Sequence, residues 1–65
     1  MNIMLVAARN SLKLTQKEAA KIANINRSTL ASLEKGGFPK LNTAYKIANA
    51  YKMSVYELFL PNAVE

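Results

Sequence analysis

Cysteine, histidine and aspartate are all absent from this chain of 65 residues. Without cysteine the chain can form neither a disulfide nor a thiolate metal site. Without histidine it lacks the usual general base near neutral pH and the commonest metal ligand. The few acidic residues are all glutamates, and the sequence holds no carboxylate pair. We therefore expect no enzyme activity, no metal or other cofactor, and no small-molecule ligand.

Long apolar runs are absent as well. The longest, Ile3 to Ala8, is far shorter than the roughly 18 residues that a membrane-spanning helix needs. No signal-peptide pattern surrounds it. The chain does have an excess of positive charge, because nine Lys and Arg against four Glu leave a net charge of +5. Such a dense positive field attracts polyanions, either nucleic acid or an anionic membrane surface.

The length of the chain allows one small domain, over residues 1–65. Residues typical of helix starts and helix ends mark the boundaries of its helices. Capping boxes of the form Thr/Ser-x-x-Glu, at Thr15 and at Ser54, mark two helix starts. Gly36 and Gly37 stop a helix, and Pro61 is expected to end the last one. No segment shows the pattern of a strand. The five expected helices run from a cap at Asn2 to about Ser11, from about Gln16 to Ala23, from Arg27 to about Glu34, from about Asn42 to Tyr51, and from Ser54 through Phe59.

A short turn, Asn24-Ile25-Asn26, joins the second and third expected helices. Asn24 tolerates the left-handed conformation that ends a helix, and Asn26 is a good cap for the next one. The residues where the two backbones would approach are small, namely Ala19, Ala20 and Ala23. In a helix-turn-helix unit the second helix lies in the DNA major groove while the first crosses above it.

The spacing of these residues resembles that of the Cro/repressor (Xre-type) helix-turn-helix family. The resemblance rests on Gln16-x-x-Ala19-Ala20-x-x-x-Asn24-Ile25-Asn26-Arg27-Ser28-Thr29-Leu30-x-x-Leu33-Glu34-x-Gly36 and on Ala44-x-x-Ile47-Ala48-x-Ala50-Tyr51-x-Met53-Ser54-Val55-x-x-Leu58-Phe59. It covers the chain from about Leu5 to Phe59. It implies a compact, all-α, five-helix domain of the lambda-repressor-like type, with the helix-turn-helix at the second and third helices.

The resemblance also implies a function. The chain would be a transcriptional regulator, a repressor, that binds double-stranded DNA as a homodimer with the helix Arg27–Glu34 in the major groove of a palindromic operator. Arginine at the start of that helix suits a bidentate contact to guanine, although Arg27 can instead clamp a phosphate. The serines of this helix either read bases or are small because the groove is close. The candidate base contacts are Arg27, Ser28, Thr29 and Ser32.

Residues around the recognition helix are the candidates for contacts to DNA phosphates. Such contacts carry affinity and salt dependence but little sequence information. The candidates are Thr15, Gln16, Lys17, Asn26, Lys35, Lys40 and Asn42. Gln16 is also a candidate to brace a side chain of the recognition helix. Lys46 and the other remaining lysines are interpreted as solvated charges.

Two further groups follow from the resemblance and from the apolar end of the chain. Arg9 and Glu34 stand where the family often has a partly buried ion pair, and the alternative is two unrelated exposed charges. A planar guanidinium can bond a carboxylate through two parallel hydrogen bonds. The end of the chain is apolar and is either a dimer contact, which we favour, or a tail folded onto the core. Its residues are Phe59, Leu60, Pro61 and Val64.

The chain departs from the family at several positions. Ala19 and Ala23 are smaller than the usual residues, so we expect the core to be filled from elsewhere, by Met4, Phe38 or Tyr45. Asn24 and Lys52 stand where the family usually has glycine. Neither departure touches the candidate DNA contacts.

Other functions were weighed against DNA binding. A protein-interaction module of the same fold, such as an antirepressor or antitoxin, would present exposed aromatic or aliphatic side chains on the third helix. That helix carries Arg27, Ser28, Thr29 and Ser32 instead. A membrane-surface peptide does not fit the short capped helices. We expect a cytoplasmic, bacterial or phage-encoded protein associated with the nucleoid.

Overall fold

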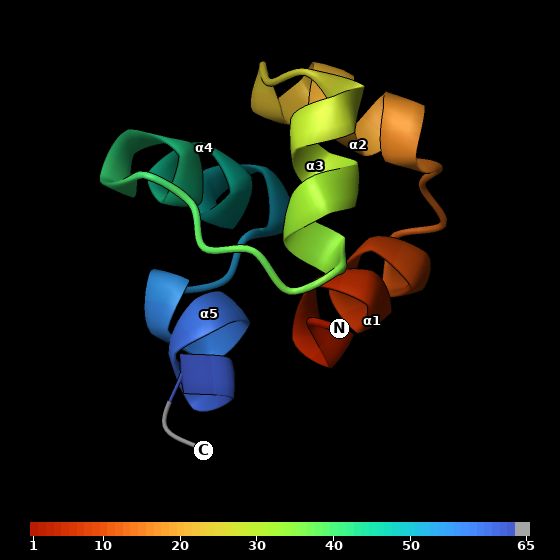
Figure 1. Cartoon of the computed structure of the whole chain (residues 1–65). Coiled ribbons are helices and arrows are strands. Elements are labelled where there is room, and N and C mark those ends of the chain that lie inside the picture. The colour runs from red at the N-terminus through yellow and green to blue at the C-terminus, as the bar shows by residue number, and fades with distance from the viewer. Residues whose placement is uncertain (64–65) are drawn as a thin grey trace.

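The computed structural model describes residues 1–63, with side chains described as far as Leu60. Within this part the chain forms five helices and no strand. They are α1 (Ile3–Ser11), α2 (Gln16–Ala23), α3 (Arg27–Glu34), α4 (Leu41–Tyr51) and α5 (Val55–Ala63) (Figure 1). The expected all-α architecture of five helices, with the helix-turn-helix at α2 and α3, is confirmed.

Side-chain caps fix where three of the helices begin. The side-chain oxygen of Asn2 accepts a backbone N–H in the first turn of α1 at 3.0 Å. At α2, Thr15 and Glu18 bond each other's backbone N–H groups at 3.1 and 2.9 Å. Ser54 and Glu57 do the same at α5, at 3.0 and 2.9 Å. Because each cap satisfies donors that a helix start leaves unpaired, these boundaries are fixed locally.

Two helix boundaries differ from the expected ones. α4 begins at Leu41, one residue early, directly after the extended residue Lys40. α5 runs through Pro61 to Ala63, so the expectation that Pro61 ends the helix was wrong. A proline cannot donate a helical hydrogen bond. Because Pro61 lies in the last turn of α5, the helix loses only that one bond before it ends.

The core lies where the helices meet. The largest fully buried side chains are Leu5, Leu30, Ile47 and Leu58, which come from α1, α3, α4 and α5 in turn. α2 contributes three alanines instead, Ala19, Ala20 and Ala23, all of them buried. Figure 1 shows α2 crossing behind α3, with α4 beside them and with α1 and α5 below. The Asn2 side chain ties those last two helices together, because its amide donates to the carbonyl of Leu58 at 2.9 Å.

The side chains expected to compensate for the small alanines do not do so. Met4, Phe38 and Tyr45 are 37%, 63% and 55% exposed, so the expectation that they fill the core was wrong. Alanine lets backbones approach closely, and α2 packs directly against α3 and α4. The short distance between helices therefore leaves no space for a larger side chain to fill.

Four residues at the apolar end of the chain were expected to form a dimer contact. Phe59 is 3% exposed and belongs to the core, so the expectation that it is a surface contact was wrong. Leu60, the next residue, is 41% exposed. The side chain of Pro61 and all of Val64 lie outside the described residues.

Among the residues that the structure describes, three other than glycine adopt the left-handed conformation, each just after a helix. They are Lys13, Asn24 and Lys52, with φ of 58°, 59° and 59°. Asparagine tolerates this region, whereas lysine pays roughly 1–2 kcal/mol for it because its Cβ crowds the following carbonyl. Lys52 therefore ends α4 at a cost in stability that glycine would avoid.

We expect Lys52→Gly to raise the free energy of unfolding by about 0.5–1 kcal/mol. The relief of the left-handed strain is partly offset by the greater freedom of glycine in the unfolded chain. Urea denaturation of the variant and the wild type measures the difference. Lys46→Gly, in the interior of α4, is the control and should lower the free energy by about 1 kcal/mol. Equal losses in both variants would contradict the strained conformation of Lys52.

Candidate nucleic-acid interface

The turn between α2 and α3 is held by backbone bonds and by one apolar anchor. Asn24 takes the left-handed conformation, with φ 59° and ψ 48°, and ends α2. The N–H of Ile25 donates to the carbonyl of Ala20 at 2.9 Å, and its side chain packs against the core. Asn26 is extended at the start of α3 but makes no side-chain cap. α3 therefore leaves the turn at a fixed angle, with its first N–H groups uncapped by side chains.

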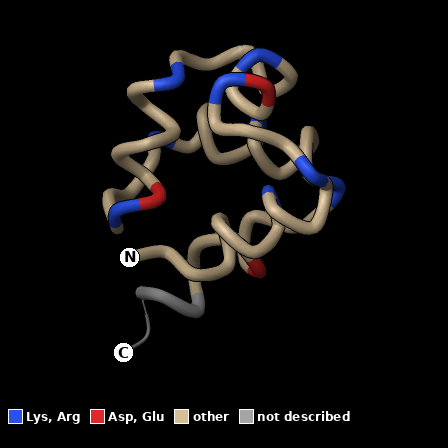
Figure 2. The backbone as a smooth tube through the Cα atoms, turned by 90° about the vertical axis from the view of Figure 1, so that its right-hand side faces the viewer, with Lys and Arg blue, Asp and Glu red and all other residues tan. Residues whose placement is uncertain are grey.

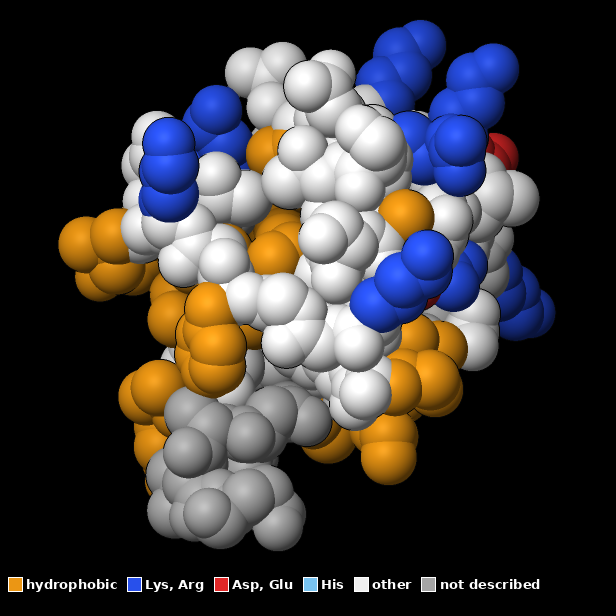
Figure 3. Space-filling model, viewed as in Figure 1, with side chains coloured by type: hydrophobic (Ala, Val, Ile, Leu, Met, Phe, Trp, Pro, Cys, Tyr) orange, Lys and Arg blue, Asp and Glu red, His pale blue; other side chains and the backbone are white. Residues whose placement is uncertain are grey.

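One face of α3 is buried and the opposite face is open. Leu30, Leu33 and Glu34 are buried. Since these residues fix how the helix is rotated, the open face presents the rest. Its exposed residues are Arg27, Ser28 and Ser32, and Thr29 and Ala31 are partly exposed. Figure 3 shows this face as mainly polar and uncharged, with basic side chains at its upper left and on its right, and with apolar ones mainly below.

Two hollows lie side by side between α3 and α4. The first, called the α3–α4 hollow, has a volume of about 500 Å³. It is lined by Ser28, Thr29, Ser32, Leu33, Phe38, Pro39, Lys40 and Thr43. The second, called the turn hollow, has about 350 Å³. It is lined by Asn24, Ile25, Asn26, Thr29, Thr43 and Lys46. Because both include Thr29 and Thr43, they adjoin as one channel along α3, with a lysine on each part and both polar and apolar residues in its lining.

A third hollow lies on the other side of α3. It is lined by Met1, Val6, Gln16, Ala31, Glu34 and Lys35. Two of the phosphate candidates, Gln16 and Lys35, are therefore separated from Lys40 by the helix itself. Figure 2 shows the basic residues spread along both sides of the helix-turn-helix rather than in one cluster. The remaining phosphate candidates, Thr15, Lys17 and Asn42, are exposed.

Three residues on or beside this face were not predicted as DNA contacts from the sequence. Ala31 follows Arg27 by one helical turn, and that spacing would have identified it. Thr43 and Lys46 lie on α4 and join the channel only because α4 packs beside α3. No local pattern in the sequence carries that information.

Glu34 joins three helices through an ion pair and a hydrogen bond. Its Oε2 lies 2.7 Å from Nε of Arg9, and its Oε1 accepts from Nη2 of Arg9 at 3.2 Å. The same Oε1 accepts from the side-chain amide of Gln16 at 2.9 Å. Arg9 also donates to the carbonyl of Leu14 at 2.8 Å. The hydrogen bond to Glu34 raises the pKa of Arg9, so this cation stays charged. The C-terminal end of α3 is thus fixed to α1 and to the start of α2.

We expect Glu34→Gln and Arg9→Met each to lower the free energy of unfolding by roughly 1–4 kcal/mol, because each leaves the other partner unpaired in a largely buried position. Denaturant midpoints measure the loss. Lys17→Met, which removes an exposed cation, is the matched control and should change stability by less than about 0.5 kcal/mol. Unchanged midpoints in both pair variants would show that the pair contributes nothing to stability.

Tyr51 lies in the core near this ion pair. Its hydroxyl has no hydrogen-bond partner among the residues that the structure describes, and its side chain is 4% exposed. Burial, and then the negative charge of Glu34, raise the pKa of Tyr51 to about 12. The unfolded chain releases this proton near pH 10 and the folded chain does not. Rising pH through this window therefore favours unfolding.

We expect Tyr51→Phe to reduce the loss of stability between about pH 9 and pH 12. Two units of pKa correspond to about 2–3 kcal/mol at the upper end of that window. Chemical denaturation at pH 8 and at pH 11.5 measures the effect. Tyr56→Phe is the control, because Tyr56 is 61% exposed and should behave as the wild type. Parallel pH profiles for all three proteins would rule out a raised pKa at Tyr51.

The described residues contain no group of three or more His, Cys, Asp or Glu side chains that could hold a metal ion. None of the helices described is long and apolar enough to cross a membrane.

The geometry defines the class of the protein. Two short helices joined by a tight turn, with the second presenting a polar face between basic flanks, form a helix-turn-helix domain. The family model described as helix-turn-helix matches residues 5–58. The chain therefore belongs to the helix-turn-helix family of the Cro/repressor (Xre) type. Members of this family are DNA-binding transcriptional regulators.

Several proteins are similar to this chain over most of its length. Two uncharacterised HTH-type transcriptional regulators of Archaeoglobus fulgidus are 38% and 42% identical, over 80% and 72% of this chain and 75% and 69% of their own lengths. A third such regulator, from Methanocaldococcus jannaschii, is 35% identical over 72% of this chain and 73% of its own length. No solved structure matches the chain significantly.

Proposed function

We propose that this chain regulates transcription by binding double-stranded DNA in a sequence-specific manner, with α3 as the recognition helix. The observation that carries the proposal is the open face of α3, which is polar, bears Arg27 at its start and lies between basic flanks. A major groove about 12 Å wide admits one α-helix and exposes base edges to it. The net charge of +5 supplies the attraction to phosphates.

The base contacts proposed come from the exposed residues of α3. Arg27 forms a bidentate contact to guanine O6 and N7. Ser28 and Ser32 give or accept single hydrogen bonds, and Thr29 offers its methyl group or its hydroxyl. Ala31 adds a methyl group that suits contact with the methyl group of thymine. In this set Arg27 discriminates strongly between bases, and the other residues discriminate weakly.

The phosphate contacts fall on both sides of α3. On one side Lys40 and Asn42 stand at the start of α4, whose first turn has no acidic residue and no side-chain cap. Its open N–H groups and its dipole favour a phosphate there. The turn hollow adds Asn26 and Lys46. On the other side of the helix the contacts come from Thr15, Gln16, Lys17 and Lys35. Contact on this side is weaker at Thr15, because the capping box engages its hydroxyl and puts Glu18 nearby.

One domain of this size contacts few base pairs, so two copies on a palindromic operator would be needed for useful specificity. A dimer that covers an operator acts as a repressor when the operator overlaps a promoter. The alternative, an antirepressor or antitoxin that binds a protein through α3, is disfavoured by the polar surface of that helix. The large exposed apolar side chains of this chain lie on other elements.

Arg27→Ala and Lys40→Ala should separate specificity from affinity. Loss of a base contact should cost about 1–3 kcal/mol on the selected operator and much less on unrelated DNA. Loss of a phosphate contact should weaken both by a similar factor and lower the salt slope by about one unit. Binding to an operator selected from random duplexes, and to a scrambled duplex of equal length, is measured at several salt concentrations.

Each result has a distinct consequence. If Arg27→Ala weakens both duplexes equally, Arg27 is a phosphate clamp and the bases are read by the other residues of α3. If the wild type binds no duplex, or binds with no dependence on salt, the proposed function is wrong. Lys21→Ala removes an exposed cation that is not among the proposed contacts, and it controls for the loss of a positive charge as such.

A further inference from the structure

The orientation of the Gln16 side chain is set by a single hydrogen bond. Its nitrogen Nε2 donates to Oε1 of Glu34 at 2.9 Å. An ionised carboxylate accepts hydrogen bonds and donates none, so the NH2 end of the amide must face Glu34. This bond uses one of the two N–H groups on Nε2. The second N–H has no partner within the part of the chain that the structure describes, so it can bind a further acceptor.

The same amide forms part of the wall of the third hollow, on the side of α3 away from Lys40. This hollow has a volume of about 510 Å³, and its polar lining comes from Gln16, Glu34 and Lys35. Lys35 is exposed, so its ammonium group is accessible to an anion there. A DNA phosphate that lies against this side of α3 therefore meets a cation and a free N–H donor together.

The carboxylate beside this place does not act as an isolated negative charge. Oε2 of Glu34 lies 2.7 Å from Nε of Arg9, and Oε1 accepts from Nη2 of Arg9 at 3.2 Å. An unpaired carboxylate so near a phosphate would repel it, whereas the charge of the guanidinium offsets that repulsion. Glu34 can therefore hold Gln16 next to a phosphate only because Arg9 pairs with it.

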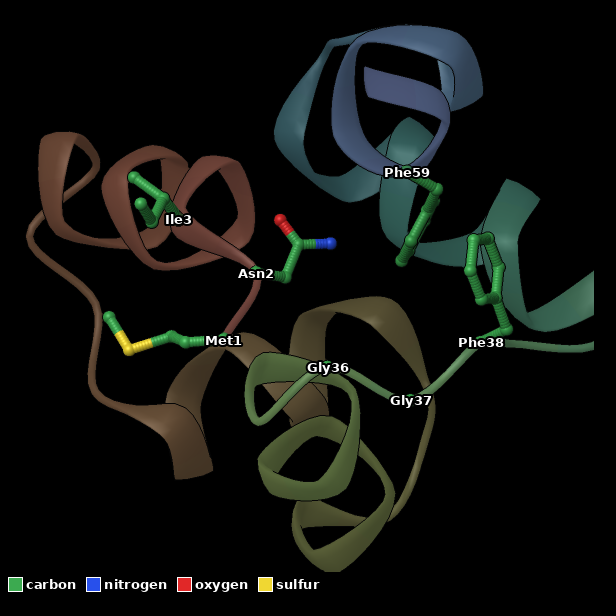
Figure 4. Close-up of a pocket in the computed structure, with 7 residues that line it drawn as sticks. All are labelled: Met1, Asn2, Ile3, Gly36, Gly37, Phe38 and Phe59. Atoms are coloured by element: carbon green, nitrogen blue, oxygen red, sulfur yellow. The ribbon is translucent and has the colours of Figure 1, made fainter. Parts of the chain in front are cut away.

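The backbone at Glu34 has an attachment that does not involve its carboxylate. The N–H of Asn2 donates to the carbonyl of Glu34 at 2.9 Å, and the side-chain amide of Asn2 donates to the carbonyl of Leu58 at 2.9 Å. Figure 4 shows Asn2 at the start of α1, beside the loop with Gly36 and Gly37 that follows α3. The end of α3 keeps this attachment when the carboxylate is replaced, so the effect of the carboxylate on Gln16 can be measured separately.

We infer that Glu34 is a positioning residue for DNA binding, which holds the amide of Gln16 so that its second N–H donates to a phosphate. Without Glu34 the amide can rotate and present its carbonyl oxygen, which repels a phosphate. This inference rests on the proposed DNA binding. The donor is neutral, so the contact adds affinity for any duplex without the release of a counterion, and the salt dependence of binding does not change with it.

The first experiment uses variants that all keep the net charge of +5. Gln16→Met removes the donor and leaves the ion pair. The double variant Arg9→Met/Glu34→Met removes the pair, and such a replacement of a buried pair by apolar side chains is often neutral for stability. Each should weaken binding to the selected operator and to the scrambled duplex by about tenfold, as loss of a hydrogen bond to a charged group does. The salt slope should stay unchanged. Asn49→Met, at an exposed position of α4, is the control and should bind as the wild type does.

A triple variant separates positioning from a purely structural role. If Glu34 acts through Gln16, the addition of Gln16→Met to the double variant causes no further loss of affinity. If the ion pair only fixes α3, the two losses add, and the ratio of specific to non-specific affinity falls because Arg27 is displaced. Additive losses, or full affinity in either Gln16→Met or the double variant, would overturn the inference and leave the proposed function intact.

The second experiment needs no DNA and no variant. Relaxation of ¹⁵N in side-chain NH2 groups measures their order in the free wild type. The Gln16 amide should have an order parameter near that of a rigid backbone, about 0.85, whereas that of the exposed Asn49 should fall below about 0.6. Equal mobility of the two amides would contradict a fixed Gln16. If the Gln16 amide is ordered but the wild type binds no duplex, the proposed function fails and the contact that orients Gln16 stands.

Discussion

The position of α3, the proposed recognition helix, depends on the carboxylate of Glu34. It is 5% exposed and bonds Arg9 of α1 and Gln16 of α2, while the carbonyl of the same residue accepts the N–H of Asn2 at 2.9 Å. A buried carboxylate without partners would be costly, so the helices that supply the donors must remain in place. α3 is thereby fixed at its C-terminal end by the ion pair of Glu34 with Arg9, and at its N-terminal end by the turn between α2 and α3. A rigid recognition helix can present its side chains to bases without further ordering.

Basic and apolar side chains lie on different parts of the surface. Most basic residues lie in or beside the helix-turn-helix and at the start of α4, with Arg9, Lys46 and Lys52 outside that region, and α5 contains no Lys or Arg. A domain of 65 residues buries a small core, and among residues 1–60 ten large apolar side chains remain exposed.

The alanines of α2 determine how closely this helix packs against its neighbours. α2 carries no large side chain on its buried face, so its backbone lies close to α3 and α4. We expected Met4, Phe38 and Tyr45 to fill the space that larger residues usually occupy in the family at the positions of Ala19 and Ala23. The close approach removes that space and leaves these side chains on the surface. Phe38 is 63% exposed and lines the α3–α4 hollow beside the proposed DNA-binding face.

The sequence by itself determined the features that depend on neighbours along the chain. Capping boxes at Thr15 and Ser54, the left-handed Asn24 and the periodic apolar residues defined the helices and the open face of α3, because such signals act within a few residues. It left the spatial relations undecided. Only the tertiary structure decided that Thr43 and Lys46 join α3 in one channel, that Phe59 is buried while Leu60 is exposed, and that α5 continues past Pro61. These depend on the distances between helices, which packing sets through contacts far apart in the sequence.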